Sequence, residues 1–169
     1  MKELLLFQLN AALVSRMRGK MTKDVLVSIR GMQFDTGLDG EKIESIQRGE
    51  YYLKNNTHYV MYEEIIEGLD TPVKNRIKFL PGEMHLSKKG AINVHMDFVE
   101  KQKNLTDYRT PFGSIVIGLE ASRVALMEEE KRMVLEVDYT LDVNYEYLAD
   151  CKIYIDIRSL DGEQFSLKS

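Results

Sequence analysis

The chain has only one cysteine, Cys151, among its 169 residues, so no disulfide can form within it. A single thiol fits a reducing cytoplasm better than secretion, and we therefore expect a cytoplasmic location. No apolar run approaches the roughly 20 residues that a helix needs to span a bilayer, so no membrane partner is expected. The chain also lacks an excess of basic residues, and its formal net charge of −4 disfavours a nucleic-acid partner.

Sequence motifs for common chemistries are missing as well. The chain contains no Gly-x-x-x-x-Gly-Lys, Gly-x-Gly-x-x-Gly or Gly-x-Ser-x-Gly. Its three histidines, His58, His85 and His95, are widely spaced, and no two lie at i, i+2 or i, i+4. A metal site needs convergent ligands, so neither a metal nor another cofactor is expected. Cys151 lies in an apolar alternating row, which indicates a buried, inert thiol, and no catalytic residue is predicted.

The length fits one domain preceded by an unusual segment. Residues 3–17 are mostly apolar and contain no Pro or Gly, which predicts a helix of about four turns. A signal peptide is disfavoured because no Ala-x-Ala-like cleavage site follows. Two interpretations stay open: a helix docked on the domain, or a wrongly assigned start, with Met21 as the true first residue. We therefore divide the chain into a helical extension at 1–20 and a β-barrel domain at 21–169.

After residue 21 the pattern is short apolar alternation broken by turn residues, which is typical of an all-β domain. Period-two alternation predicts strands with one buried and one solvated face. A change of phase at Gly31 predicts a β-bulge there, and Asn55-Asn56 predicts a tight hairpin turn. We expect an antiparallel β-barrel of about eight to ten strands. The side chains predicted to face inward are those of Val27, Ile29, Val94, Met96, Leu135, Val137, Tyr139, Ile153 and Ile155.

Several of these motifs resemble those of the YwiB-like family of uncharacterised bacterial proteins, found mostly in Firmicutes. The resemblance extends from about Lys23 to about Leu160. It rests on the segments Asp24–Gly31, Tyr62–Glu64, Tyr108–Gly113 and Tyr139–Asp142. It implies a calycin-like, lipocalin-like barrel but brings no activity with it. Calycin relatives such as lipocalins bind small apolar ligands, which is an analogy at the level of fold.

The first candidate site is the segment Tyr62-Glu63-Glu64, where Tyr62 and Glu64 share one strand face. Whichever face is buried carries a carboxylate, and a buried carboxylate needs a partner. Arg30, Arg76 and Arg109 are the candidate partners. The alternative is that both carboxylates are solvated at a strand edge.

The second candidate is the Tyr108-to-Gly113 segment, interpreted as a turn whose Tyr108, Arg109 and Thr110 offer two hydroxyls and a guanidinium for an anion. The alternative is a tight corner set by Pro111 and Gly113. With Tyr139 of the inner row added, the candidate ligand-binding residues are Tyr62, Glu64, Tyr108, Arg109, Thr110 and Tyr139.

Together these features favour a protein that binds a small apolar or amphipathic ligand at or inside the barrel. Two other functions remain open. One is a protein-interaction module without a ligand, which would display an apolar patch or a bare strand edge. The other is an acid–base enzyme that uses a carboxylate at the barrel mouth.

Overall fold

A computed structural model of the protein describes residues 21, 23–33 and 43–160, and these residues form strands and turns without a helix. The predicted extension at 1–20 lies outside them. Within the described part of the chain, no helix has the length and apolarity needed to cross a membrane. The strands are β1 (Asp24–Gln33), β2 (Ile43–Lys54), β3 (Thr57–Glu64), β4 (Val73–Leu80), β5 (Glu83–Lys89), β6 (Val94–Val99), β7 (Lys103–Thr110), β8 (Gly113–Glu128), β9 (Arg132–Val143) and β10 (Glu146–Ser159).

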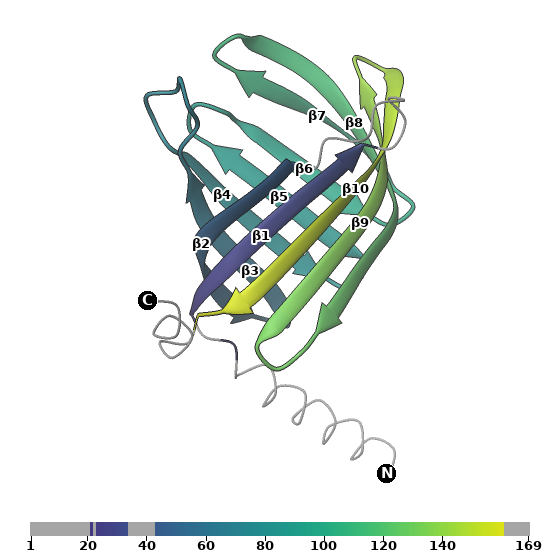
Figure 1. The fold of residues 1–169 in the computed structure, drawn as a ribbon. Coiled ribbons are helices and arrows are strands. Elements are labelled where there is room, and N and C mark those ends of the chain that lie inside the picture. Colours follow the sequence, from purple (N-terminus) through teal and green to yellow (C-terminus); the bar gives the residue numbers. More distant parts are fainter. Residues whose placement is uncertain (1–20, 22, 34–42, 161–169) are drawn as a thin grey trace.

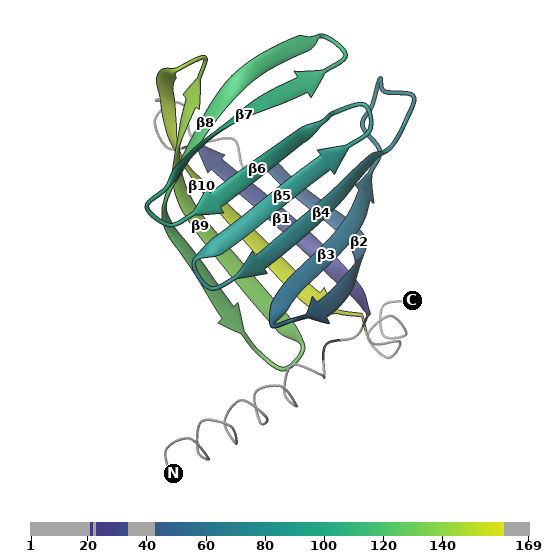
Figure 2. The ribbon, with the colours of Figure 1, turned by 180° about the vertical axis from the view of Figure 1, so that it is seen from behind.

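The ten strands form one antiparallel sheet in the order β6-β5-β4-β3-β2-β1-β10-β9-β8-β7. β1 pairs with β10, so the first and last strands join the two halves of the sheet. The edge strands β6 and β7 meet through Asn93 and Arg109, whose backbones exchange hydrogen bonds with N···O distances of 2.9 and 3.0 Å. The sheet is thus a nearly closed barrel with a seam between β6 and β7 (Figures 1 and 2). The predicted all-β antiparallel barrel of about eight to ten strands is confirmed.

The core lies inside the barrel, as the alternation predicts. All nine residues predicted to face inward belong to or pack against one buried apolar cluster. Its largest fully buried members include Phe79, Phe98, Met133 and Leu135. Burial of such side chains contributes roughly 1.5–3 kcal/mol each, so this cluster is a major source of stability for the described barrel.

Two register shifts change which side chains face inward. In β8 the shift falls between Ala121 and Arg123, which leaves Ser122 as the extra residue. The buried apolar side chains of β8 are Ile117, Leu119 and Ala121 before the shift and Val124 after it. A second shift, between Tyr147 and Ala149, interrupts β10. The bulge predicted at Gly31 is wrong, because the pairing of β1 with β10 runs without a shift from Val25 to Gln33.

The two ends of the barrel differ in character. We call the end where the odd-numbered strands begin the lower end and the opposite end the upper end, as they appear in Figure 1. At the lower end, His58 is 1% exposed and stacks on Phe79 with ring centroids 5.0 Å apart. Its Nδ1 lies 2.9 Å from the Tyr51 hydroxyl. The Asn55-Asn56 turn beside it has positive φ at both residues, as predicted.

Candidate functional site in the upper part of the barrel interior

Five polar side chains gather on the inner face of β3, β4, β5 and β7. The strand register makes Tyr62, Asn75 and Lys88 successive cross-strand neighbours. Glu64 lies two residues beyond Tyr62, on the same face of β3. Tyr108 of β7 comes close enough for the charge of Glu64 to act on its hydroxyl. We call Tyr62, Glu64, Asn75, Lys88 and Tyr108 the inner polar cluster.

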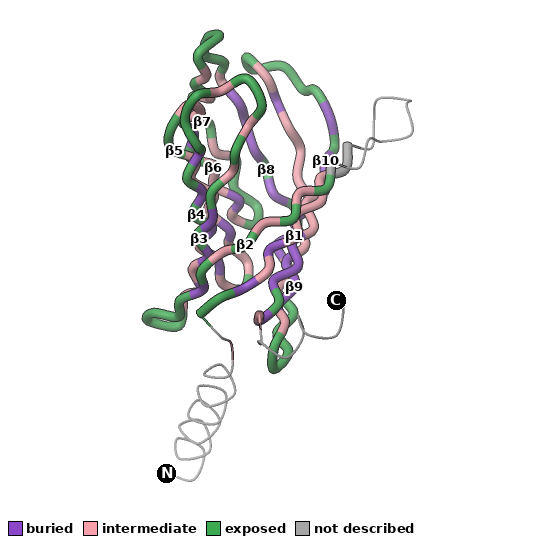
Figure 3. Tube along the Cα trace, turned by 60° about the vertical axis from the view of Figure 1, so that its left-hand side comes forward, coloured by how far each residue is buried: buried purple, intermediate pink, exposed green. Residues whose placement is uncertain are grey.

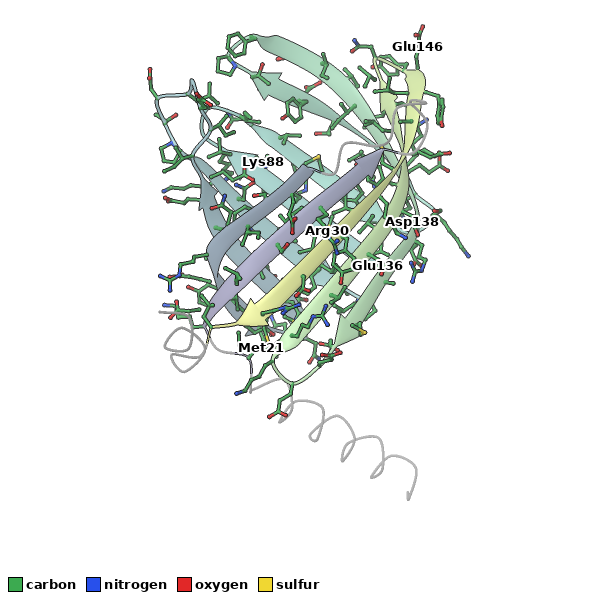
Figure 4. All side chains as sticks on the ribbon, viewed as in Figure 1. Met21, Arg30, Lys88, Glu136, Asp138 and Glu146 are labelled. Atoms are coloured by element: carbon green, nitrogen blue, oxygen red, sulfur yellow. The ribbon has the colours of Figure 1, made fainter. Side chains whose placement is uncertain are left out.

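An ion pair is the most prominent contact in this cluster. Lys88 Nζ lies 3.0 Å from Glu64 Oε2, and the two side chains are only 17% and 18% exposed. Figure 4 marks Lys88 toward the upper end of the barrel. The Glu64 carboxylate is therefore the partly buried carboxylate predicted from the Tyr62–Glu64 alternation. A charge removed from water in this way needs a partner, which Lys88 supplies.

The three arginines predicted as partners of this carboxylate do not fill that role. Arg30 lies 4.5 Å from the ring centroid of Tyr154, on the face that also carries Glu136 and Asp138 (Figure 4). The side chains of Arg76 and Arg109 are exposed, because they alternate with inner residues on β4 and β7. Their prediction as partners is therefore wrong, and Lys88 is the residue that sequence reasoning missed.

Asn75 adds a buried acceptor that is not satisfied. Its side-chain Nδ2 donates to the carbonyl oxygen of Val73 at 3.2 Å. Its Oδ1 is buried and accepts no hydrogen bond in the described structure. Leaving such an atom unpaired costs about 1–3 kcal/mol, so a buried orphan acceptor calls for an explanation.

The two tyrosines of the cluster remain hydrogen-bond donors over a wide pH range. Burial raises the pKa of Tyr62 well above its usual value, and the charge of Glu64 raises it further. Tyr108 is affected in the same way, again mainly by burial and then by Glu64. Both phenols therefore stay protonated near neutral pH.

The remaining predicted site residues lie apart from this cluster. Arg109 points outward, 68% exposed, with its Nη2 3.5 Å from Asp107. The Thr110 hydroxyl caps its own turn, because it donates to the carbonyl of Gly113 at 3.1 Å. Tyr139 packs edge-on against Phe98, and burial raises its pKa. The turn predicted over Tyr108–Gly113 is confined to Pro111 and Phe112, as in the tight-corner alternative. Tyr108, Arg109 and Thr110 belong to strand β7, and strand alternation places Arg109 on the opposite face from Tyr108.

Several apolar side chains on the inner face of the barrel are only partly buried. Ile29, Met96, Leu141 and Ile153 face inward and pack against the core without being fully buried. Beyond them, the tips of the β7–β8 and β9–β10 hairpins are exposed (Figure 3). Phe112 is 91% exposed at the first tip and Tyr145 is 73% exposed at the second. The upper end thus combines a few polar groups with apolar surface.

These features define a ten-stranded antiparallel barrel protein with a polar cluster in its upper interior. The chain belongs to the family described as Domain of unknown function (DUF1934), whose model matches residues 27–155. It is 24% identical over 127 residues to the "Uncharacterized beta-barrel protein YwiB" of Bacillus subtilis (strain 168), an alignment that covers 75% of this chain and 87% of that protein.

The crystal structure of the ywiB protein from Bacillus subtilis has the same fold. The TM-score is 0.71 at 20% sequence identity, and the match covers 85% of this chain and 98% of that one. The resemblance to the YwiB-like family, inferred from the motifs, is thereby confirmed.

Proposed function

We propose that the protein binds a small amphipathic molecule in the upper part of the barrel, with its polar group at the inner polar cluster. The observation that carries this proposal is the unsatisfied Oδ1 of Asn75, buried directly beside Lys88 and Tyr62 in the strand register. A ligand that donates a hydrogen bond there removes an energetic penalty that the protein alone retains.

The other groups of the cluster add selectivity for such a ligand. The hydroxyls of Tyr62 and Tyr108 donate hydrogen bonds, and the Glu64–Lys88 ion pair provides both signs of charge. The partly exposed inner side chains, including Met96 and Leu141, offer apolar contact for the rest of the molecule. Pockets for small molecules commonly combine an apolar wall with a few placed polar groups.

The barrel architecture supports the proposal at the level of fold alone. Sequence neighbours pair throughout the sheet apart from the seam, and β1 pairs with β10, which supports a calycin-like type. Barrels of about this strand number can hold one small ligand. We assign the protein to the cytoplasm on the ground of its single, buried cysteine.

A protein-interaction function is the second candidate. The observation that favours it is the pair of exposed hairpin tips, at which Phe112, Tyr145 and Tyr147 are largely in solvent. The two hairpins are tied together, because Asn144 N donates to Val116 O at 2.8 Å. Exposed apolar surface of this kind marks binding sites for proteins as well as for ligands.

Native mass spectrometry of the full chain purified from its own host, followed by a thermal-shift screen of fatty acids and amphipathic metabolites, tests the proposal. A ligand at a hundred times its Kd stabilises the fold by roughly 2.7 kcal/mol, which corresponds to a melting shift of roughly 5–10 °C. We expect Tyr62→Phe to reduce that shift and Tyr59→Phe, on the outer face of the same strand, to preserve it. Absence of both a bound mass and a melting shift would contradict ligand binding.

A further inference from the structure

The β5–β6 hairpin carries two histidines and an aspartate on the outer face of the barrel. The register pairs His85 with Asp97 and Ser87 with His95. Met84 and Phe98, which alternate with them, are buried in the core. The three side chains therefore project outward together, on the face opposite to the inner polar cluster.

Their potential ligand atoms converge on one point. His85 Nδ1 lies 2.5 Å and His95 Nε2 lies 2.8 Å from the same oxygen, Asp97 Oδ1. The two imidazole rings are nearly parallel, with an interplanar angle of 15° and centroids 6.4 Å apart. One ligand atom from each of the three residues lies within 4.8 Å of the others.

From this geometry we infer a binding site for one divalent transition-metal ion, with Zn²⁺ as its best-suited occupant. Two imidazole nitrogens and a carboxylate oxygen are donors that Zn²⁺ accepts, at about 2.0–2.2 Å each. Ligand atoms of a tetrahedral ion lie roughly 3.3 Å apart at such bond lengths, so the two short contacts need to lengthen by less than about 1 Å. The fourth position faces solvent and takes a water molecule.

The second nitrogen of each histidine is held in the way that metal-binding histidines require. His85 Nε2 lies 3.3 Å from Glu83 Oε2, and His95 Nδ1 lies 2.9 Å from Ser87 Oγ. An acceptor at this position fixes the proton there and leaves the other nitrogen as a lone-pair donor. With the proton on these nitrogens, Nδ1 of His85 and Nε2 of His95 are the atoms left to bind the ion, once it replaces their contacts with the Asp97 carboxylate.

The site lies at the edge of the sheet, so a bound ion links an edge strand to its neighbour. β6 is an edge strand of the sheet, joined to β7 at the seam by few contacts, one of which is Asn104 Nδ2 donating to Asp97 O at 3.2 Å. An ion held by His85 on β5 and by Asp97 and His95 on β6 ties this edge strand to its neighbour. Binding should therefore raise the melting temperature of the barrel.

Isothermal titration calorimetry with Zn²⁺, on the full chain without a histidine tag, tests the site, and Co²⁺ absorption in the visible range reports its geometry. We expect one ion per chain, loss of at least a hundredfold in affinity in His85→Gln and in His95→Gln, and a loss of about 10- to 100-fold in Ser87→Ala. Asp150→Asn, which changes an exposed carboxylate on β10, is the control and should leave affinity unchanged.

Two results would overturn the inference. One is the absence of stoichiometric Zn²⁺ binding by the full chain. The other is binding that persists in the double variant His85→Gln/His95→Gln, which would place the ion elsewhere. Circular dichroism of each variant establishes that the barrel is folded. Because His85, His95 and Asp97 face outward whereas the inner polar cluster faces inward, the zinc titration and the ligand screen test different sites.

Discussion

The carboxylate of Glu128 lies 2.8 Å from Nε2 of His58, although their strands, β8 and β3, are not neighbours in the sheet. The contact depends on the extra residue at Ser122 in β8. Without that shift, strand alternation would place the side chain of Glu128 on the outer face. The bulge in β8 thus brings an acceptor, the carboxylate of Glu128, to the buried imidazole of His58 on β3.

Replacing Glu128 by Ala should lower the free energy of unfolding by about 1–3 kcal/mol, because a buried imidazole loses one of its hydrogen-bonding partners. Urea denaturation followed by circular dichroism measures this difference. Glu129→Ala, at an exposed position one residue further along, serves as the control and should change stability by less than about 0.5 kcal/mol. Equal stability of the two variants would show that the contact contributes nothing.

Gly49 lies where no side chain fits. A Cβ there would come within 2.8 Å of the carbonyl oxygen of Met61 and 3.2 Å of Val27 Cγ2. Gly49→Ala should therefore destabilise the barrel by about 1–3 kcal/mol through overpacking. Gly31→Ala is the matched control on β1, since a Cβ at Gly31 meets nothing within 4 Å. Thermal denaturation of both variants distinguishes them, and an unchanged melting temperature for Gly49→Ala would refute the close approach.

Asp156 makes the stability of the fold depend on pH in the acid range. Burial tends to raise the pKa of this carboxyl, but hydrogen bonds from Arg132 and Arg158 outweigh it and hold the pKa below its usual value. A lowered pKa in the folded state contributes stability above the unfolded value of about 3.9, and that contribution is lost as the pH falls through the folded value.

The Asp156→Asn variant tests this dependence. It should be less stable than the wild type at pH 7, and the difference should shrink as the pH falls below about 4. Urea midpoints at pH 7, 4 and 3 measure the effect, with the exposed Asp107→Asn as control. A stability difference that stays constant across this range would contradict the role assigned to Asp156.

The sequence predicted the inner rows well, because alternation is a local property of each strand. Val27, Val94, Leu135 and Ile155 are buried where their spacing indicates. The bulges were harder to predict, because a shift of one residue is visible in the pairing between two strands and not in the amino-acid composition of either strand. Gly31 looked like a bulge and is regular, whereas the shift at Ser122 left no glycine to mark it.

The candidate site was predicted in part for a related reason. Alternation placed Tyr62 and Glu64 together, but the partner of Glu64 depends on how β3, β4 and β5 align. Lys88 is 24 residues from Glu64, and only the register of two hairpins brings them to 3.0 Å. The convergence of His85 and His95 was missed likewise, because ten residues of separation look remote until the hairpin is folded.

The most direct test of the central claim is the Kd of the ligand identified by native mass spectrometry, measured for Lys88→Met and Lys89→Met. The two lysines are adjacent in β5 but alternate between the inner and outer faces, so their variants are closely matched. Binding at the inner polar cluster predicts at least a tenfold weaker Kd for Lys88→Met and an unchanged Kd for Lys89→Met. Equal affinities in the two folded variants would contradict ligand binding at this cluster.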